Sequence, residues 1–247
     1  MAQKAHQPCT EPLQDIQPVD VSALQPILAD SYQRLRGKPV PPLTVRFYPY
    51  ANLNHTIRLR QGRILLRLSD ILADAPAQVL AAISLILLHK LLSRRPPQAM
   101  RRLYRDYIGQ PSMRRRSLLV RQQRGRKWLT SEKGRNFDLS RLFDDLNQRY
   151  FEGRLKIRRL SWSRSRNKRI LGHYDEAHRT IIIDRRLDHP RIPRQVVEFV
   201  LFHEMLHAVH GERIHNGRRW VHHASFREAE RSFHAYEEAQ QFIRSRL

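Results

Sequence analysis

The chain has 247 residues, of which 40% are hydrophobic, so it is long and apolar enough to bury a real core and is not a disordered chain. Its 46 Lys and Arg residues against 23 Asp and Glu residues give a formal charge of +23. This excess favours a polyanionic partner, and nucleic acid is the leading candidate. The plain alternative is that the charge mainly supplies solubility.

Cysteine usage and apolar runs narrow the class further. Cys9 is the single cysteine, which excludes an intramolecular disulfide framework and a cysteine-based zinc site and fits a reducing compartment. Residues 1–20 lack the apolar core of a signal peptide, and the longest apolar run, Val79 to Leu88, is too short to span a bilayer. We therefore expect a soluble, cytoplasmic protein without a membrane partner, and association with the nucleoid is compatible with this expectation.

The N-terminal half begins with residues 1–20, which are rich in Pro and Gln and predict a mobile tail without chemistry. An α+β region is expected over residues 21–110, because helical and strand-like apolar patterns alternate there. The expected elements are a helix, two strands and a second helix at 21–35, 43–48, 64–68 and 77–92.

Positive charge concentrates between the two halves. Residues 94–135 hold fourteen Lys or Arg residues against Asp106 and Glu132, a net charge of +12. Residues 111–135 are predicted to form an exposed basic linker.

Residues 136–247 predict a second α+β region. A helix near 139–151 is followed by three short strand-like segments and then by a long apolar helix near 194–210. A loop rich in Gly, Asn and Arg leads to a last helix near 225–246.

The long helix carries the motif HExxH, as His203-Glu-Met-Leu-His207. Residues four apart on a helix lie one above the other, so His203 and His207 would offer two imidazoles to one ion, with Glu204 beside it. This arrangement is the signature of a zinc peptidase, in which the carboxylate serves as general base.

A catalytic zinc ion usually has three protein ligands and one open position. Five downstream histidines compete for the third place: His210, His215, His222, His223 and His234. His210 would crowd the same helix, His215 lies in the loop, and His222 and His223 stand just before the last helix, where a returning chain can meet the metal.

A shift of the sequence by 114 residues reveals an internal similarity. His89 falls on His203, whereas Lys90 falls on Glu204 and Ser93 falls on the second histidine of the motif. Five further positions match: Asp70, Asp74, Pro76, Leu87 and Leu92 have the same residue type 114 positions later. We therefore predict that the N-terminal half is a degenerate duplicate of the C-terminal fold, lacking the base and one ligand. The alternative is two unrelated helices, each preceded by Asp and Pro.

An ordered series in the second half resembles a SprT-like domain, the domain of the DNA-dependent protease Spartan and its bacterial relatives. The series comprises Tyr150 to Leu155 (YFEGRL), Ile157, Leu160 to Trp162 (LSW), Leu171 to Tyr174 (LGHY), Thr180 to Asp184 (TIIID), His203 to His207, His222 and Phe226. The resemblance covers about Phe137 to Phe233. It implies a zincin-like fold of a helix, a small sheet, the HExxH helix and a C-terminal helix.

The resemblance also implies a ligand set and an activity. In SprT-like proteins the third ligand follows the second by about fifteen residues and precedes an aromatic residue by four, and His222 with Phe226 meets both conditions. The implied site is one Zn²⁺ held by His203, His207 and His222. The implied activity is that of a zinc metallopeptidase, in which Glu204 accepts the proton of the attacking water and later delivers it to the leaving amine.

Nucleic-acid contacts are expected from basic and aromatic residues near the motif. Many bacterial relatives carry a cysteine zinc ribbon after the domain, and this chain has no cysteine for one. Basic groups would contact phosphates and tryptophans would stack on unpaired bases of single-stranded or distorted DNA. The candidates are Trp162, Arg164, Arg166, Lys168, Arg169, Arg218, Arg219 and Trp220.

The sequence thus predicts a zinc-dependent peptidase of SprT-like type that acts on proteins associated with or crosslinked to DNA, as in the repair of DNA–protein crosslinks. The alternative is a non-enzymatic nucleic-acid-binding protein with a structural or vestigial metal site, and a third class is a metal-dependent hydrolase of a non-peptide bond. The sequence does not predict the oligomeric state.

Overall fold

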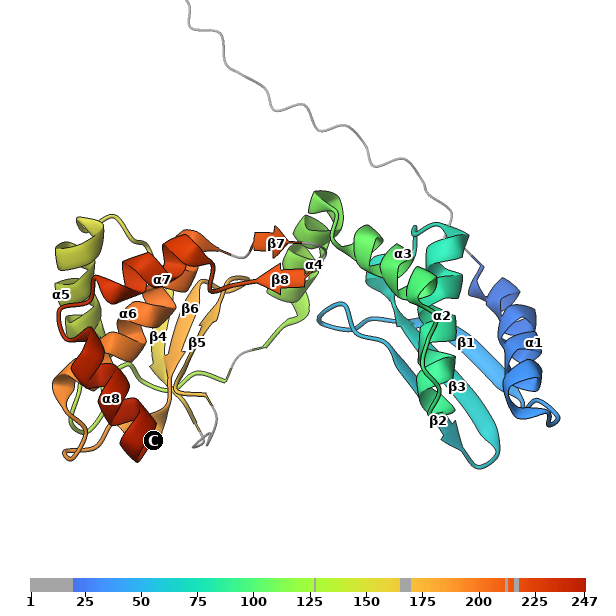
Figure 1. Ribbon diagram of the computed structural model, residues 1–247, viewed down its shortest axis with the longest axis horizontal. Coiled ribbons are helices and arrows are strands. Elements are labelled where there is room, and N and C mark those ends of the chain that lie inside the picture. Colours follow the sequence, from blue (N-terminus) through green and yellow to red (C-terminus); the bar gives the residue numbers. More distant parts are fainter. Residues whose placement is uncertain (1–19, 127, 165–169, 212, 216–217) are drawn as a thin grey trace, which may run out of the picture. The chain divides into compact units, whose positions relative to one another are not determined.

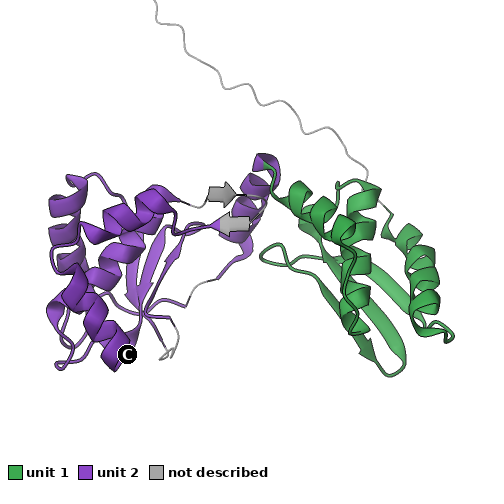
Figure 2. Cartoon of the chain, in the orientation of Figure 1, with its two compact units in different colours: residues 1–110 green, residues 111–247 purple. Residues whose placement is uncertain are grey.

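The structure is a computed structural model that describes residues 20–126, 128–164, 170–211, 213–215 and 218–247, with the side chains of 213–215, 218 and 219 left out. The chain forms two compact units, Met1–Gln110 and Pro111–Leu247 (Figure 2). Both are mixed α+β, as the sequence predicted. The predicted tail, apart from Asp20, lies outside the described residues.

Unit 1 packs helices α1 and α2 against a three-stranded sheet (Figure 1). In chain order its elements are η1 (Val21–Ala23), α1 (Leu24–Arg36), β1 (Leu43–Tyr48), β2 (Thr56–Arg60), β3 (Arg63–Ser69), η2 (Asp70–Leu72), α2 (Ala77–Leu91) and α3 (Gln98–Ile108). Strand β3 is the central strand of this sheet, between β1 and β2. Its alternate residues Ile64, Leu66 and Leu68 are almost fully buried, as expected for one face of a strand that packs on the core. The sequence had not indicated β2, which pairs with β3 through a tight turn at Gln61 and Gly62, both of positive φ.

Unit 2 contains the HExxH helix. Its elements are α4 (Pro111–Arg124), α5 (Leu139–Phe151), β4 (Arg159–Trp162), β5 (Gly172–Asp175), β6 (Thr180–Ile183), η3 (Arg185–Leu187), α6 (Arg194–His210), β7 (Arg213–His215), β8 (Arg218–Trp220), α7 (Ala224–Arg231) and α8 (Tyr236–Arg246). The expected last helix is therefore two helices, α7 and α8.

The two units share one topology. In unit 1 the strand order is β1-β3-β2, and in unit 2 it is β4-β6-β5. The first pair of each sheet is parallel and the second pair is antiparallel. The register of the parallel pair is also the same, since Tyr48 pairs with Ser69 and Trp162 pairs with Ile183, positions related by the shift of 114. In both units a short helix then leads into the long helix.

Helix α6 is the centre of the unit 2 core. Ten of its seventeen residues are buried, and it contacts α5, α7, α8 and the strands β5 and β6. The ring of Phe202 lies 4.7 Å from that of Tyr150 and 5.5 Å from that of Phe233, which ties α6 to α5 and to the segment after α7. A helix that is apolar on almost every side is stable only when it is enclosed in this way.

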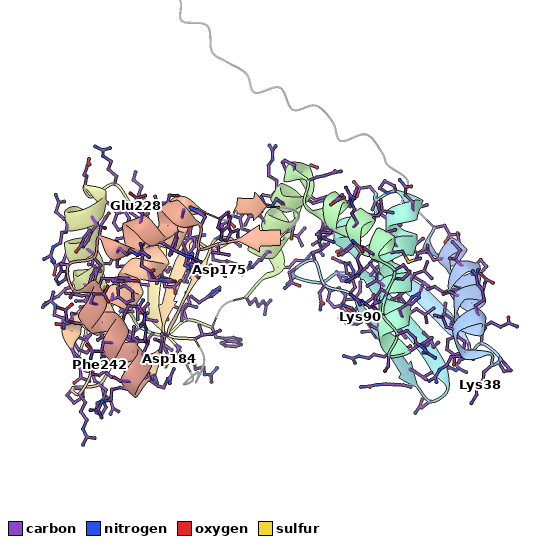
Figure 3. All side chains as sticks on the ribbon, viewed as in Figure 1. Lys38, Lys90, Asp175, Asp184, Glu228 and Phe242 are labelled. Atoms are coloured by element: carbon purple, nitrogen blue, oxygen red, sulfur yellow. The ribbon has the colours of Figure 1, made fainter. Side chains whose placement is uncertain are left out.

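Residues 111–135, predicted to form an exposed linker, are instead part of unit 2. They begin with helix α4, from which Arg121 reaches the fully buried carboxylate of Asp175 at 3.1 Å (Figure 3). Further along, the backbone N–H of Thr130 donates to Ser161 Oγ at 2.8 Å. The segment is exposed along most of α4, as predicted, but it packs on unit 2 through a half-exposed arginine that pairs with a buried carboxylate.

None of the helices in the described part of the chain has the length and apolar character needed to cross a membrane.

His55 makes unit 1 sensitive to acid. Its Nδ1 accepts from the backbone N–H of Ser69 at 3.0 Å and its Nε2 lies 2.8 Å from the hydroxyl of Tyr104, so the ring is held neutral. Burial lowers the pKa of His55 to about 4, below its ordinary value of 6.5. The unfolded chain therefore takes up the proton first, and stability is full above pH 6.5 and falls as the pH drops towards 4.

We predict that this loss reaches about 3 kcal/mol of unfolding free energy at the low end of that window. Thermal unfolding of the full chain at pH 7.5 and pH 4, for the wild type and for His55→Gln, measures it. The variant keeps an acceptor and a donor without the titration, so its melting temperature should depend less on pH. Equal pH dependence in the two proteins would contradict the assignment.

Candidate metal centre

Helix α6 positions the first two histidines. The ring nitrogens His203 Nε2 and His207 Nε2 are 3.1 Å apart, because a separation of four residues places both imidazoles on one side of the helix. Glu204 follows His203 directly, so its side chain leaves the helix about 100° further round, towards strand β5.

The third histidine comes from the segment that leads into α7. His222 Nε2 lies 3.3 Å from His207 Nε2, and the ligand atoms of His203, His207 and His222 all lie within 4.8 Å of one another. These are the three residues predicted from the motif and from the resemblance to SprT-like proteins, and they form the one group of this kind found among the described residues.

The competing histidines have other partners. His223 caps α7, since its Nδ1 accepts from the backbone N–H of Phe226 at 3.3 Å and lies 2.8 Å from Ser225 Oγ. His234 Nδ1 lies 3.1 Å from the hydroxyl of Tyr150. The ring of His210 packs on His223 with centroids 5.5 Å apart. The side chain of His215 lies outside the described residues.

The spacing of the three nitrogens fits a tetrahedral metal ion. Two nitrogens bound to zinc at the usual bond length and tetrahedral angle are about 3.3 Å apart. The separations of His207 Nε2 from the other two nitrogens, 3.1 and 3.3 Å, are close to this value, and all three ligand atoms lie within 4.8 Å of one another. Burial, followed by the neighbouring histidines, lowers the pKa of His207 to about 3, and burial also lowers the pKa of His222. Neutral imidazoles each offer a lone pair, so the donor set can hold a metal ion.

Glu230 on α7 fixes the orientation of His203. Its Oε1 lies 2.6 Å from His203 Nδ1, so the imidazole donates its proton there and leaves Nε2 as the electron-pair donor. The sequence interpretation missed this residue. A signal was available, because Glu230 follows Phe226 by four on α7 and therefore shares its face, which turns towards the three histidines.

Phe226 packs beneath all three rings. Its own ring is fully buried and lies 5.2 Å from His203, 4.7 Å from His207 and 4.9 Å from His222, measured between centroids. This contact explains why an aromatic residue follows the third histidine by four positions. From the first turn of α7, its ring packs against all three imidazoles and restricts their movement.

Glu204 is held in an apolar setting beside the histidines. Its side chain is 5% exposed, and burial raises its pKa to about 7, while the charge of His203 and the backbone N–H of Tyr174 act in the opposite direction. Gly172 approaches the carboxylate so closely that a Cβ atom there would lie 2.7 Å from Glu204 Oε1. A glycine at this position of β5 therefore lets the carboxylate lie against the strand.

A cavity of about 690 Å³ opens over these groups. It contains His203, Glu204, His207 and His222 in its wall together with strand β5. Much of the remaining wall is apolar: Ile170, Leu171, Phe199, Val200, Val221 and Ile243. The arrangement can therefore hold a metal ion and an adjacent carboxylate beside a mainly apolar space.

One comparison with known protein families gives a match. The model of the SprT-like family matches residues 139–242. Unit 2 contains a SprT-like domain. The resemblance predicted over about Phe137 to Phe233 is thus confirmed. Searches of the curated proteins and of the solved structures found no match.

The predicted nucleic-acid-binding residues differ in their exposure. Trp162 is 2% exposed and belongs to the core of unit 2, so the prediction that its ring stacks on bases is wrong. The ring is buried because its strand lies between β6 and helix α5 in the core. Arg164 is exposed, and Trp220 is 44% exposed. The other predicted residues, Arg166, Lys168, Arg169 and the side chains of Arg218 and Arg219, lie outside the described residues.

We predict that Glu230→Ala lowers metal affinity about 10- to 100-fold, because His203 loses the acceptor that fixes its orientation. Glu228→Ala is the matched control, since Glu228 lies exposed on the same helix and the charge change is identical. Competition with a chromogenic zinc chelator gives the affinity, and circular dichroism checks the fold. Equal affinities of the two variants would show that Glu230 does not position the ligand.

Proposed function

We propose that unit 2 is a zinc-dependent peptidase and that its substrates are proteins associated with or crosslinked to DNA. The observation that carries the proposal is the convergence of three imidazole nitrogens and the carboxylate of Glu204 on one cavity within a SprT-like domain. A purely structural metal site needs no such carboxylate and no open cavity beside the ligands.

The chemistry divides between the metal and this chain's residues. A zinc ion held by three histidines supplies a Lewis acid that polarises a carbonyl and makes water more acidic. Glu204 takes the proton from the attacking water and delivers it to the leaving amine. The backbone N–H of Tyr174 holds the carboxylate in place for both transfers. The apolar wall of the cavity excludes bulk water from the reacting groups.

Strand β5 offers a place for the substrate backbone. It is an edge strand in the described sheet, paired with β6, and Gly172, His173 and Tyr174 line the cavity. An extended peptide can add to such an edge through backbone hydrogen bonds, which require no particular side chain. This mode suits an enzyme that cleaves exposed, unfolded segments of many proteins.

A nucleic-acid partner is the second part of the proposal. The formal charge of +23 supports it, and helices α3 and α4 carry Arg101, Arg102, Arg105, Arg114, Arg115, Arg116, Arg121 and Arg124. Contacts of this type bind phosphates without reading sequence and weaken with salt. The proposed setting is intracellular, in the cytoplasm or at the nucleoid.

Unit 1 is proposed to be a degenerate copy of the same domain, retained for packing or for binding. The common strand order and the common register of the parallel pair support it. In the alignment at a shift of 114, Lys90 on α2 stands where unit 2 has Glu204 (Figure 3). The capping prolines Pro76 and Pro193 differ by 117, so α2 starts about one turn earlier than α6 in this alignment.

We predict that Glu204→Gln slows cleavage strongly while metal binding persists. Loss of a general base lowers the rate about 10²- to 10⁴-fold, and the amide removes the base with little change in size. The assay follows cleavage of a denatured protein and of a protein crosslinked to single-stranded DNA, with zinc content measured in parallel. Equal cleavage by the two proteins, at equal zinc content, would exclude the proposed mechanism.

Gly172→Ala should lower the cleavage rate at least about tenfold, because the added Cβ would displace the Glu204 carboxylate. A shift of a catalytic group by about 1 Å can cost roughly 10²-fold in rate. Metal affinity should stay the same, since the three imidazoles are untouched. Gly62→Ala is not a suitable control, because Gly62 has a positive φ that alanine rarely adopts. Ala208→Gly, in the wall of the same cavity, instead tests whether the cleavage rate responds to any small change there. A rate unchanged in Gly172→Ala would contradict the proposed contact.

A further inference from the structure

Unit 2 has a second cavity, of about 890 Å³, that shares no lining residue with the metal centre. Three segments enclose it: residues 130–136, the end of β4 at Trp162, and residues 185–190. Because β4 and β6 are parallel, both carboxyl ends meet there, and this edge is where sheets of parallel strands commonly bind ligands.

The wall of this cavity is cationic. It carries Lys133, Arg135, Arg185 and Arg186 against a single carboxylate, that of Asp188. The carboxylate is already engaged, since it accepts from the backbone N–H groups of residues 135, 136 and 137 at 2.6, 2.8 and 3.2 Å. These bonds fix the cavity's shape and leave the positive side chains in excess, so the ligand should be an anion.

Two buried donors in the wall lack an acceptor in the described part of the chain: Trp162 Nε1 and Arg186 Nη2. Trp162 is 2% exposed, and Arg186 is held by its Nε, which donates to Asp184 at 3.3 Å. Leaving a buried donor unpaired costs free energy, so such groups in a native fold indicate a missing partner. A phosphate has several acceptor oxygens and negative charge, so it suits a wall with unpaired donors and an excess of cationic side chains.

An aromatic surface stands next to the cavity. Trp128, just before Thr130 in the wall, is 78% exposed, and the guanidinium of Arg164 lies 5.7 Å from its ring centre. The cavity and Arg164 are linked, because the backbone N–H of Arg185 donates to Ser163 Oγ at 3.0 Å. An exposed indole supported by an arginine is suited to stacking on an unpaired base.

We propose that this cavity binds a phosphate of a single-stranded nucleic acid while Trp128 stacks on a neighbouring base. The site builds on the proposed nucleic-acid partner but not on peptidase activity. Trp162, predicted as a stacking platform, is instead a buried part of the cavity wall. Trp128, two residues before Thr130 in the wall, supplies the stacking face.

The test measures binding of a fluorescein-labelled oligothymidylate by anisotropy, using the full chain with Glu204→Gln so that cleavage plays no part. Trp128→Ala should weaken binding about tenfold, the loss of one stacked base. Arg185→Ala should weaken binding and reduce the slope of log affinity against log salt by about 0.7, the value for one phosphate on a single strand. Arg141→Ala is the matched control, since this arginine on α5 is 87% exposed. It should change neither the affinity nor the salt slope strongly.

Each outcome is decisive. Weaker binding in Trp128→Ala and Arg185→Ala, with Arg141→Ala unchanged, supports the site. Unchanged binding in both variants overturns it and leaves nucleic-acid binding to the other basic surfaces. No binding by any of the proteins overturns both this site and the proposed partner, whereas peptidase activity is tested separately. Thymidine monophosphate competing as well as the oligonucleotide would overturn the assignment to a strand.

Discussion

The structure of unit 2 depends on the burial of helix α6, which is enclosed on almost every side and yet must present a metal site. Helical periodicity resolves this conflict. His203 and His207 share the side that turns towards α7, and Glu204 points to β5, where a glycine makes room for its carboxylate. The ligands and the base therefore approach one cavity from different sides of the helix. Eight of the other positions are apolar and buried in the core, namely Val196, Val197, Phe199, Val200, Leu201, Phe202, Met205 and Leu206.

Polar groups in such an apolar setting need partners, and here they come from different parts of the chain. Glu230 on α7 accepts the proton of His203, and the backbone of β5 donates to Glu204. The lone pairs of the three imidazoles remain, and they converge at a spacing that suits a metal ion. A metal ion bound there, as proposed, would take up these lone pairs. The adjacent histidines have different roles: His222 faces this centre, and His223 caps α7.

Local patterns in the sequence predicted the parts of the fold that rest on local physics. Helix α6 and its first two histidines followed from periodicity and spacing, whereas the choice between His222 and His223 depends on which ring caps α7, a matter of local backbone direction. Glu230 was missed because its contact with His203 spans 27 residues. Trp162 was placed on the surface because basic residues follow it, although β4 packs its side chain into the core. The attachment of α4 to unit 2 was missed because the pair of Arg121 with Asp175 spans 54 residues of sequence.

A comparison of the two units shows which residues of the candidate metal centre are absent from unit 1, although the strand order is the same. Unit 1 forms the same sheet and encloses α2 without an HExxH motif, so the architecture itself needs no metal. Its buried His89 satisfies Nδ1 with the carbonyl of Leu85 on its own helix, at 2.8 Å. Helix α3, which follows α2, carries neither a histidine nor a glutamate. Under the proposed duplication, unit 1 therefore differs in both halves of the centre, the long helix and the segment after it. Because ligands and orienting carboxylate come from two elements, a glutamate in place of Lys90 would restore no site.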